Sequence, residues 1–306
     1  MKIKLLLGLS ILAFAFAPTS KKIDLKFNLE KGKTYTQNTM MKTVTKQTIA
    51  GAEQIINQSA GTITKIELKE TGADANTYTL WYDNISMGID QGGGIKQEFN
   101  SDTTTLETVD PMSKIFSSLT GKKFDANINS TGKIVEVKGL EEIITNATSS
   151  MGEQAALIAE QMSAGFGDSG LAKNMEMLTA IMPGESVKVG STWTNQQFTS
   201  TGLPLIVANT FTLKSVENGI AVIDVKANIT VDPDAASTEI QGMKAAYFME
   251  GSRTGTIQLE VNTGWAKSAE INDKIVGSIT IEANAQMPDG MTIPIEMDSN
   301  TTVTSN

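Results

Sequence analysis

The chain of 306 residues contains no cysteine and no histidine. Without cysteine no disulfide can form, so a packed core must stabilise the fold. Without histidine the chain lacks the commonest general base near neutral pH, the usual zinc ligand and every Ser-His-Asp arrangement. We therefore expect a protein that is not an enzyme and that holds no metal and no cofactor. A hydrolase that uses carboxylates alone, such as Glu141 or Glu142 with Asp273, is the catalytic alternative.

Basic residues are outnumbered, with 25 Lys and Arg against 34 Asp and Glu, and the net charge is −9. No cluster of basic residues stands out, so we expect no nucleic-acid partner. Aromatic residues make up only 6% of the chain. Trp81, Trp193 and Trp265 each fall within an expected strand, which favours packing over a carbohydrate-binding face.

The first residues have the pattern of an export signal. Lys2 and Lys4 precede an apolar run from Leu5 to Ala17. This run is too short for a membrane-spanning helix, which needs about 20 apolar residues. We expect residues 1–20 to be a signal peptide, cleaved between Ala15 and Ser20. The mature chain would then be exported, periplasmic or extracellular, with no membrane span.

After this leader, apolar and polar residues alternate with period two in segments rich in Thr, Val and Ile, which is typical of antiparallel strands. The expected strands cover residues 23–29, 35–49, 54–70, 78–87, 124–128, 134–137, 191–200, 205–216, 220–231, 254–261, 265–271, 274–286 and 291–304. Turn residues separate them, most clearly Asn218-Gly219, because both residues tolerate positive φ. The fold class expected is mainly β (β-rich α+β), with long curved antiparallel strands.

Helical spacing of apolar residues is confined to the middle of the chain, from Leu140 to Met182, where Pro183-Gly184 ends it. A shorter helix is expected after Asp110-Pro111, which has the sequence of a helix N-cap and first position. The mature chain thus divides into an N-terminal β half (21–138), a central helical segment (139–183) and a C-terminal β half (184–306).

The two β halves resemble each other at two places. Lys31–Thr36 has a counterpart in Val189–Thr194, and Asn129–Ile134 has one in Val261–Ala266. Such matches indicate either two similar halves, packed around or beside the central helix, or the turn chemistry that recurs in any β protein. Both interpretations are compatible with the sequence.

Several of these segments together resemble an uncharacterised family of secreted, β-rich Bacteroidota proteins. The resemblance lies in the leader, in Lys31–Tyr35, in Leu119–Lys133 and in Pro183–Trp193. It implies an exported β-rich fold and transfers no activity. A curved sheet capped by a Met-rich helix is also similar, more weakly, to periplasmic lipid and lipoprotein carriers, whose half-barrels close on an acyl chain.

The central helical segment carries the candidate ligand-binding residues. Methionine is flexible and polarizable and therefore suits adaptable apolar surfaces. If these helices face a cavity, its lining includes Met151, Ile158, Met162, Met175 and Leu178. The alternative is ordinary packing of the helices on the sheet.

Three functions are compatible with these patterns. The first is a non-catalytic carrier that binds a hydrophobic small molecule or lipid between the curved sheet and the central helix. The second is an envelope structural or interaction protein without a cavity, which binds a partner protein at a sheet edge. The third is the carboxylate-only hydrolase.

Overall fold

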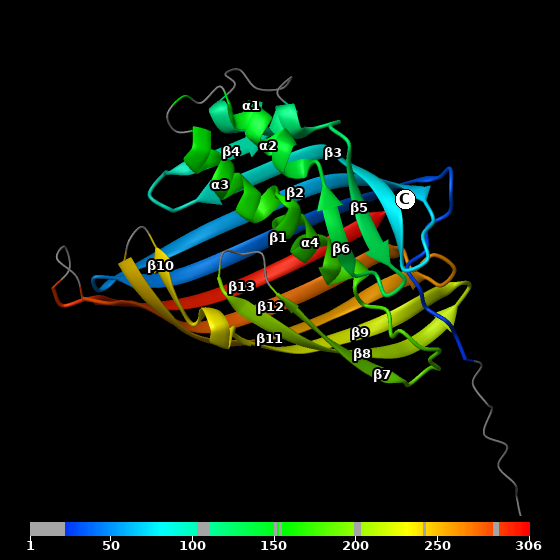
Figure 1. Cartoon of the computed structure of the whole chain (residues 1–306). Helices are drawn as coiled ribbons and strands as arrows, with labels where there is room; N and C mark the ends of the chain where they lie inside the picture. The colour runs from blue at the N-terminus through cyan, green and yellow to red at the C-terminus, as the bar shows by residue number, and fades with distance from the viewer. Residues whose placement is uncertain are drawn as a thin grey trace, which may run out of the picture.

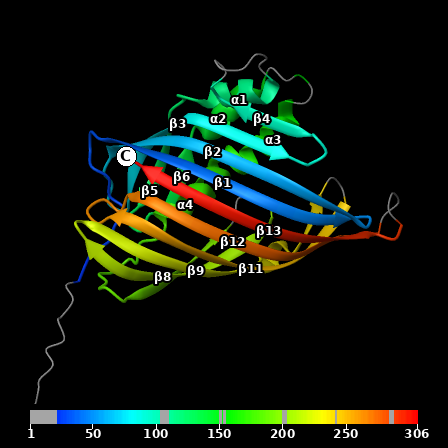
Figure 2. The ribbon, with the colours of Figure 1, turned by 180° about the vertical axis from the view of Figure 1, so that it is seen from behind.

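The computed structural model describes residues 22–102, 110–149, 152, 155–198, 203–240, 243–283 and 288–306. The predicted signal peptide lies outside these residues. Thirteen strands form a single antiparallel sheet that curves, and the helices cover its concave face (Figure 1). The view from behind shows the strands in front of the helices, so the helices lie on one side of the sheet (Figure 2). The prediction of a mainly β fold is confirmed.

The strands of the first half are β1 (Thr34–Ile49), β2 (Ala52–Glu70), β3 (Ala75–Asp90), β4 (Lys96–Asn100), β5 (Phe124–Asn129) and β6 (Ile134–Lys138). The helices that follow β4 and β6 are α1 (Pro111–Leu119), α2 (Leu140–Thr148), α3 (Ala155–Phe166) and α4 (Asp168–Thr179). The second half contains β7 (Thr192–Phe198), β8 (Leu205–Glu217), β9 (Ile220–Val231), β10 (Ser237–Ile240), β11 (Met243–Glu260), β12 (Ala266–Ile281) and β13 (Met291–Ser305).

The strand order explains how the two halves are joined. The main path of the sheet reads β6-β5-β3-β2-β1-β13-β12-β11-β9-β8-β7, with β4 beside β3 and β10 beside β11. The chain therefore starts in the middle of the sheet, meanders to the β6 edge, and crosses through α2, α3 and α4 to the β7 edge. It then returns to the middle, where β13 pairs with β1.

Local signals produce the turns and the first helix as predicted. Ala50 and Gly51, both with positive φ, connect β1 to β2, and Asn218 and Gly219 connect β8 to β9 in the same conformation. Asp110 caps α1, because its side chain accepts a hydrogen bond of 2.8 Å from the backbone N–H of Ser113.

The prediction of a strand over residues 23–29 is wrong. Leu25, Phe27 and Leu29 are buried, as the alternation suggests. The backbone, however, bonds to three separate loops and not to one strand. Ile23 pairs with Val187, Phe27 N–H donates to the carbonyl of Ser130, and Asn28 N–H donates to the carbonyl of Thr263. In the second half, the two strands expected over 265–271 and 274–286 form one continuous strand, β12.

Buried apolar side chains form two clusters. The larger, the main core, joins the helices to the sheet and includes Phe116, Ile144, Leu178 and Ile271. The smaller lies on the long strands of the second half. No α-helix in the described part of the chain combines the length and hydrophobicity needed to cross a bilayer.

Candidate binding site on the concave face

The structure places the predicted ligand-binding residues in or against the main core. Met162, Met175 and Leu178 are buried, with 5%, 9% and 2% of their surface exposed. Ile158 is partly buried and packs against the same cluster, and Met151 lies outside the described residues. These positions show helix-on-sheet packing for the buried side chains, and a ligand contact there stays a prediction.

A second apolar surface, which the sequence analysis did not single out, lies on the sheet itself. We call it the outer cluster, and its buried members are Leu205, Val207, Ala227, Ile229, Tyr247, Met249, Ile275 and Ile295. Partly exposed side chains surround it: Leu203, Val231, Ile279, Ile293 and Met297. Within the described residues, every member comes from the strands or from Leu203 just before β8, and none comes from a helix.

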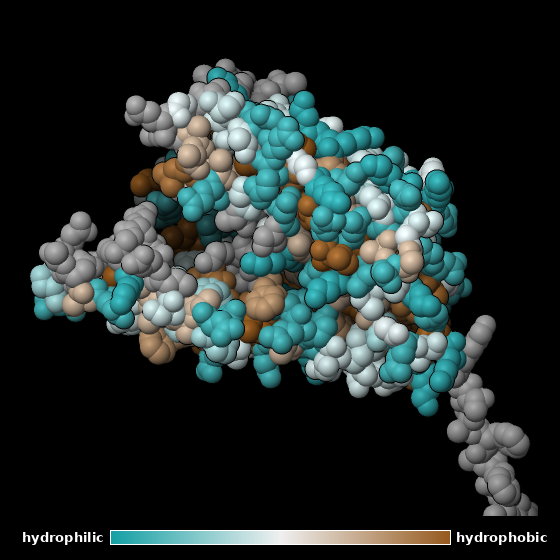
Figure 3. All heavy atoms as spheres, viewed as in Figure 1, coloured by the Kyte–Doolittle hydropathy of each residue, from teal (hydrophilic) through white to brown (hydrophobic). Residues whose placement is uncertain are grey.

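No described helix contributes to this part of the sheet, although its inner members are buried, with Leu205, Val207 and Ile229 each 1% exposed. An apolar sheet face is stable only when another layer covers it. Figure 3 shows the molecule hollowed between the helical layer and the long strands, with hydrophobic residues deep in the hollow.

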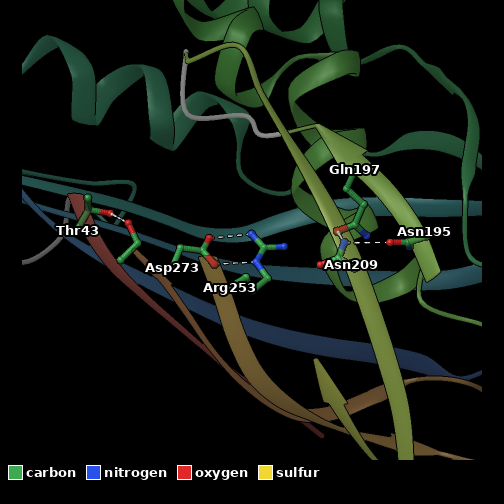
Figure 4. Close-up of polar contacts among 7 residues, drawn as sticks. Thr43, Asn195, Gln197, Asn209, Arg253 and Asp273 are labelled. Carbon is green, nitrogen blue, oxygen red and sulfur yellow. Dashed lines mark hydrogen bonds and ion pairs between the residues drawn. The ribbon is translucent and has the colours of Figure 1, made fainter. Parts of the chain in front are cut away.

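Polar side chains cross the sheet between the two clusters (Figure 4). We call them the polar row: Asn195 on β7, Asn209 on β8, Arg253 on β11, Asp273 on β12, Ser299 on β13 and Thr43 on β1. The strand register places each beside the next, with Ala227 of β9 between Asn209 and Arg253. The row therefore marks the boundary between the main core and the outer cluster.

Arg253, the only arginine of the chain, forms a two-point ion pair with Asp273. Its Nε donates to Oδ1 at 2.7 Å and its Nη2 donates to Oδ2 at 2.8 Å. The two side chains are only 7% and 18% exposed. The two parallel hydrogen bonds hold the pair in one geometry. Loss of either partner would leave a nearly buried charge unmatched.

The hydrogen bonds of the Asn195, Gln197 and Asn209 side-chain amides allow a single orientation of each amide. Gln197 Nε2 donates to the carbonyl of Glu176 at 2.7 Å, and Asn195 Nδ2 donates to the carbonyl of Ala180. Because carbonyls only accept, the side-chain oxygens of Gln197 and Asn195 are turned towards Asn209. Asn209 Nδ2 donates to these oxygens at 3.0 and 2.9 Å. Asn209 Oδ1 is thereby left buried without a hydrogen bond.

Of the carboxylates that the hydrolase hypothesis names, Asp273 forms the ion pair with Arg253, and a catalytic pair stays a prediction. Glu141 instead accepts hydrogen bonds from the Ser163 hydroxyl at 2.5 Å and from the backbone N–H of Asp168 at 3.1 Å. Burial, together with the charge of Glu141, raises the pKa of Asp168. Among the residues that the structure describes, no three acidic side chains are grouped closely enough to hold a metal ion.

Residues 75–266 match the model of DUF6263, a family of unknown function. The match spans more than half of the chain. The chain belongs to this family. An uncharacterised β-rich family was predicted from the sequence, and to this extent the DUF6263 match confirms it; an origin in Bacteroidota stays a prediction. No curated protein matches the chain.

Solved structures resemble this DUF6263 protein only distantly. An outer membrane channel from Pseudomonas putida F1 is 6% identical, with 92% of this chain and 97% of that one covered and a TM-score of 0.23. OmpF of Salmonella typhi, in complex with daunomycin, is 7% identical, with coverages of 90% and 97% and a TM-score of 0.18. Similarity at this level carries no conclusion about the fold or the function.

Proposed function

We propose that this DUF6263 member is an exported, non-catalytic protein that binds an apolar ligand on the concave face of its sheet, against the outer cluster. The observation that carries the proposal is the outer cluster itself, an apolar sheet surface to which no described helix contributes. An apolar ligand would cover the partly exposed side chains at its margin, such as Ile279, Ile293 and Met297. Full burial of an exposed apolar side chain is worth about 1.5–3 kcal/mol, and each of these partly buried side chains would contribute a fraction of that.

This site differs from the one expected between the Met-rich helices and the sheet. The helical methionines Met162 and Met175 are already buried in the main core. The hollow in Figure 3 and the partly exposed Met297 at the margin of the outer cluster support a position farther along the strands. The absence of histidine supports a binding role over catalysis, because the commonest general base is missing.

The test is native mass spectrometry of the protein purified in its exported form, followed by organic extraction and lipid analysis. We expect an apolar molecule to co-purify in a fixed ratio. Met297→Trp places a large side chain at the margin of the outer cluster and should reduce the bound fraction by half or more. Val276→Trp is the matched control, because Val276 is 49% exposed on the convex face of the neighbouring strand.

A wild-type protein that carries no ligand, and that takes up none when refolded with an extract of apolar molecules, would contradict the proposal. That result would favour the second hypothesis, an envelope interaction protein. Equal loss of ligand in both tryptophan variants would show that the effect is not specific to the concave face.

A further inference from the structure

Charged side chains at one end of the long strands are divided unequally between the two faces of the sheet. We call this end the open end, because the hollow in Figure 3 lies over it. It comprises residues 43–49 of β1, 52–60 of β2, 243–253 of β11, 273–281 of β12 and 291–299 of β13. Its charged residues are Lys46, Glu53, Lys244, Glu250, Arg253, Asp273, Lys274, Glu296 and Asp298.

All of these residues except the two members of the ion pair lie on the convex face. Ile275 and Ile295 of the outer cluster point to the concave face, so Lys274 and Glu296 beside them in sequence point away from it. Residues that lie opposite one another in the ladders share a face. The register therefore assigns the rest of the convex set: Lys46, Glu53, Lys244, Glu250 and Asp298.

The two charged residues on the concave face neutralise each other. Arg253 and Asp273 are joined by two hydrogen bonds, as Figure 4 shows, and their side chains are only 7% and 18% exposed. Within the described part of the open end, no other charged side chain of these strands belongs to the concave face. A ligand on this face therefore meets no strand charge with which it can pair.

Neutral amides and hydroxyls border the outer cluster on this face. Gln47 lies opposite Ile295 in the β1–β13 ladder and opposite Gln54 in the β1–β2 ladder. The Nε2 atom of Gln47 donates to Oε1 of Gln54 at 3.1 Å. Thr45 lies opposite Met297 in the same way. The margin of the outer cluster therefore adjoins groups that form hydrogen bonds without carrying a charge.

The length of the uncharged surface decides which ligands it suits. On β12 it extends from Asp273 to Ile281, which is about 27 Å at 3.4 Å per residue. A short amphiphile at the margin of the outer cluster lies wholly on this surface. Transfer of a charged group from water to such a surface is costly, because no opposite charge compensates it, whereas a neutral hydroxyl can bond to an amide.

We propose that the ligand of the concave face is an electrically neutral amphiphile, such as a long-chain alcohol, and that this face discriminates against fatty acids and alkylammonium ions. This inference rests on the proposed function and specifies the class of ligand. The confinement of unpaired charges to the convex face of the strands is the feature that selects it. The exposed amide of Gln54 and the half-buried amide of Gln47 are the nearest partners for the polar group of the ligand.

The test compares three ten-carbon probes in displacement of the neutral dye N-phenyl-1-naphthylamine from the full mature chain at pH 7. The alcohol 1-decanol is neutral, decanoate is an anion and decylammonium is a cation. We expect 1-decanol to bind at least about tenfold more tightly than either ion, which is 1.4 kcal/mol.

Gln47→Lys places a positive charge on the concave face and should bring the affinity for decanoate to within about twofold of that for 1-decanol. Thr48→Lys is the matched control, because Thr48 is the next residue of β1, is also half-buried and points to the convex face. It adds the same charge and should leave the order of the three probes unchanged. If Gln47→Lys fails to fold, the order of affinities in the wild type still decides the question.

The outcomes separate the two proposals. Equal affinity for all three probes would overturn the assignment of a neutral ligand and would leave the apolar site standing. A preference for either ion would also overturn it, because a charge from the helical layer would then face the ligand. So would an order of affinities that Gln47→Lys does not change, since the probes would then lie away from this face. Failure of every probe to displace the dye would overturn both proposals.

Discussion

Glu176 connects the helical layer to both edges of the sheet. Its side chain accepts a hydrogen bond of 2.9 Å from the backbone N–H of Ile134 on β6, and its carbonyl accepts from Gln197 on β7. Burial raises the pKa of its carboxyl, although the hydrogen bond from Ile134 and the charge of Lys133 act in the opposite direction. The Glu176 carboxylate therefore has a hydrogen-bond donor, but its burial disfavours the charged form.

Glu176→Gln should consequently stabilise the protein at pH 7. The glutamine oxygen can still accept from Ile134, while the buried charge is lost. Because the folded-state pKa lies above the unfolded value of 4.5, the destabilisation grows as pH rises from 4.5 to the folded pKa and is constant above it. Urea unfolding should show the largest difference at pH 7 and none below pH 4.5.

Glu185→Gln is the control, since it removes the same charge from an exposed side chain. A Glu176→Gln variant that is less stable than the wild type at pH 7 would contradict the prediction. So would a stability difference that persists at pH 4.

At the scale of elements, the β5–β6 turn packs on the end of α4. Gly132 has φ of +82°, and a Cβ placed there would collide with the carbonyl of Thr179. The Thr179 hydroxyl also donates to the carbonyl of Gly132 at 2.7 Å. The turn and the helix therefore meet backbone to backbone, a contact that only glycine permits.

Gly132→Ala should destabilise the protein by roughly 3 kcal/mol or more, because it combines a left-handed backbone with a clash against backbone. Gly121→Ala is the matched control. Gly121 has φ of +72° with open space around it, so we expect about 1–2 kcal/mol there. Urea unfolding of both variants measures the difference, and equal losses would refute the proposed contact.

The same scale shows how far the sequence predicts the fold. The cap at Asp110 and the turns at 50–51 and 218–219 depend on neighbouring residues, and they were predicted. The segment 23–29 was not, because its partners are loops distant in the sequence. The alternation of apolar and polar residues in this segment indicates that one side is buried. A β-strand and an extended segment without strand pairing both give that pattern.

Part of the polar row could be predicted from the sequence. Arg253 and Asp273 each lie ten residues from Thr263 in the predicted turn 262–264, so counting along that hairpin pairs them. The position of Asn209 next to Ala227 and Arg253 was not, because it needs β8, β9 and β11 in register, and β10 lies between the last two in the chain. Likewise, the same alternation of apolar and polar residues predicts the main core and the outer cluster. The two differ in whether helices pack on them, which the alternation does not indicate.

At the scale of the whole molecule, the two β halves share one sheet. The β1–β13 ladder joins them from Gln37–Ser305 to Gln47–Ile295. The main core takes side chains from both, including Tyr35, which stacks edge-on against Trp265 with ring centroids 5.4 Å apart. Neither half therefore has a complete core of its own.

Fragments 22–183 and 184–306, produced separately, should each lack a sharp thermal transition. Each would expose a long strand edge, and each would lose part of the main core. Refolding of the two fragments together should restore a cooperative transition and the fluorescence of buried Trp265. A fragment 184–306 that unfolds cooperatively alone would show that the halves are independent.

The pairing of β1 with β13 also determines when the sheet can be completed during synthesis. The hydroxyls of Thr43 and Ser299 meet at 2.8 Å although 256 residues separate them in the chain. During synthesis β1 is the first long strand to emerge, yet one of its neighbours is the last. Contacts of such long range form slowly, because a large loop must close before they contribute. The chain therefore stays incompletely folded until its final strand is available, a delay that is compatible with the export that we propose.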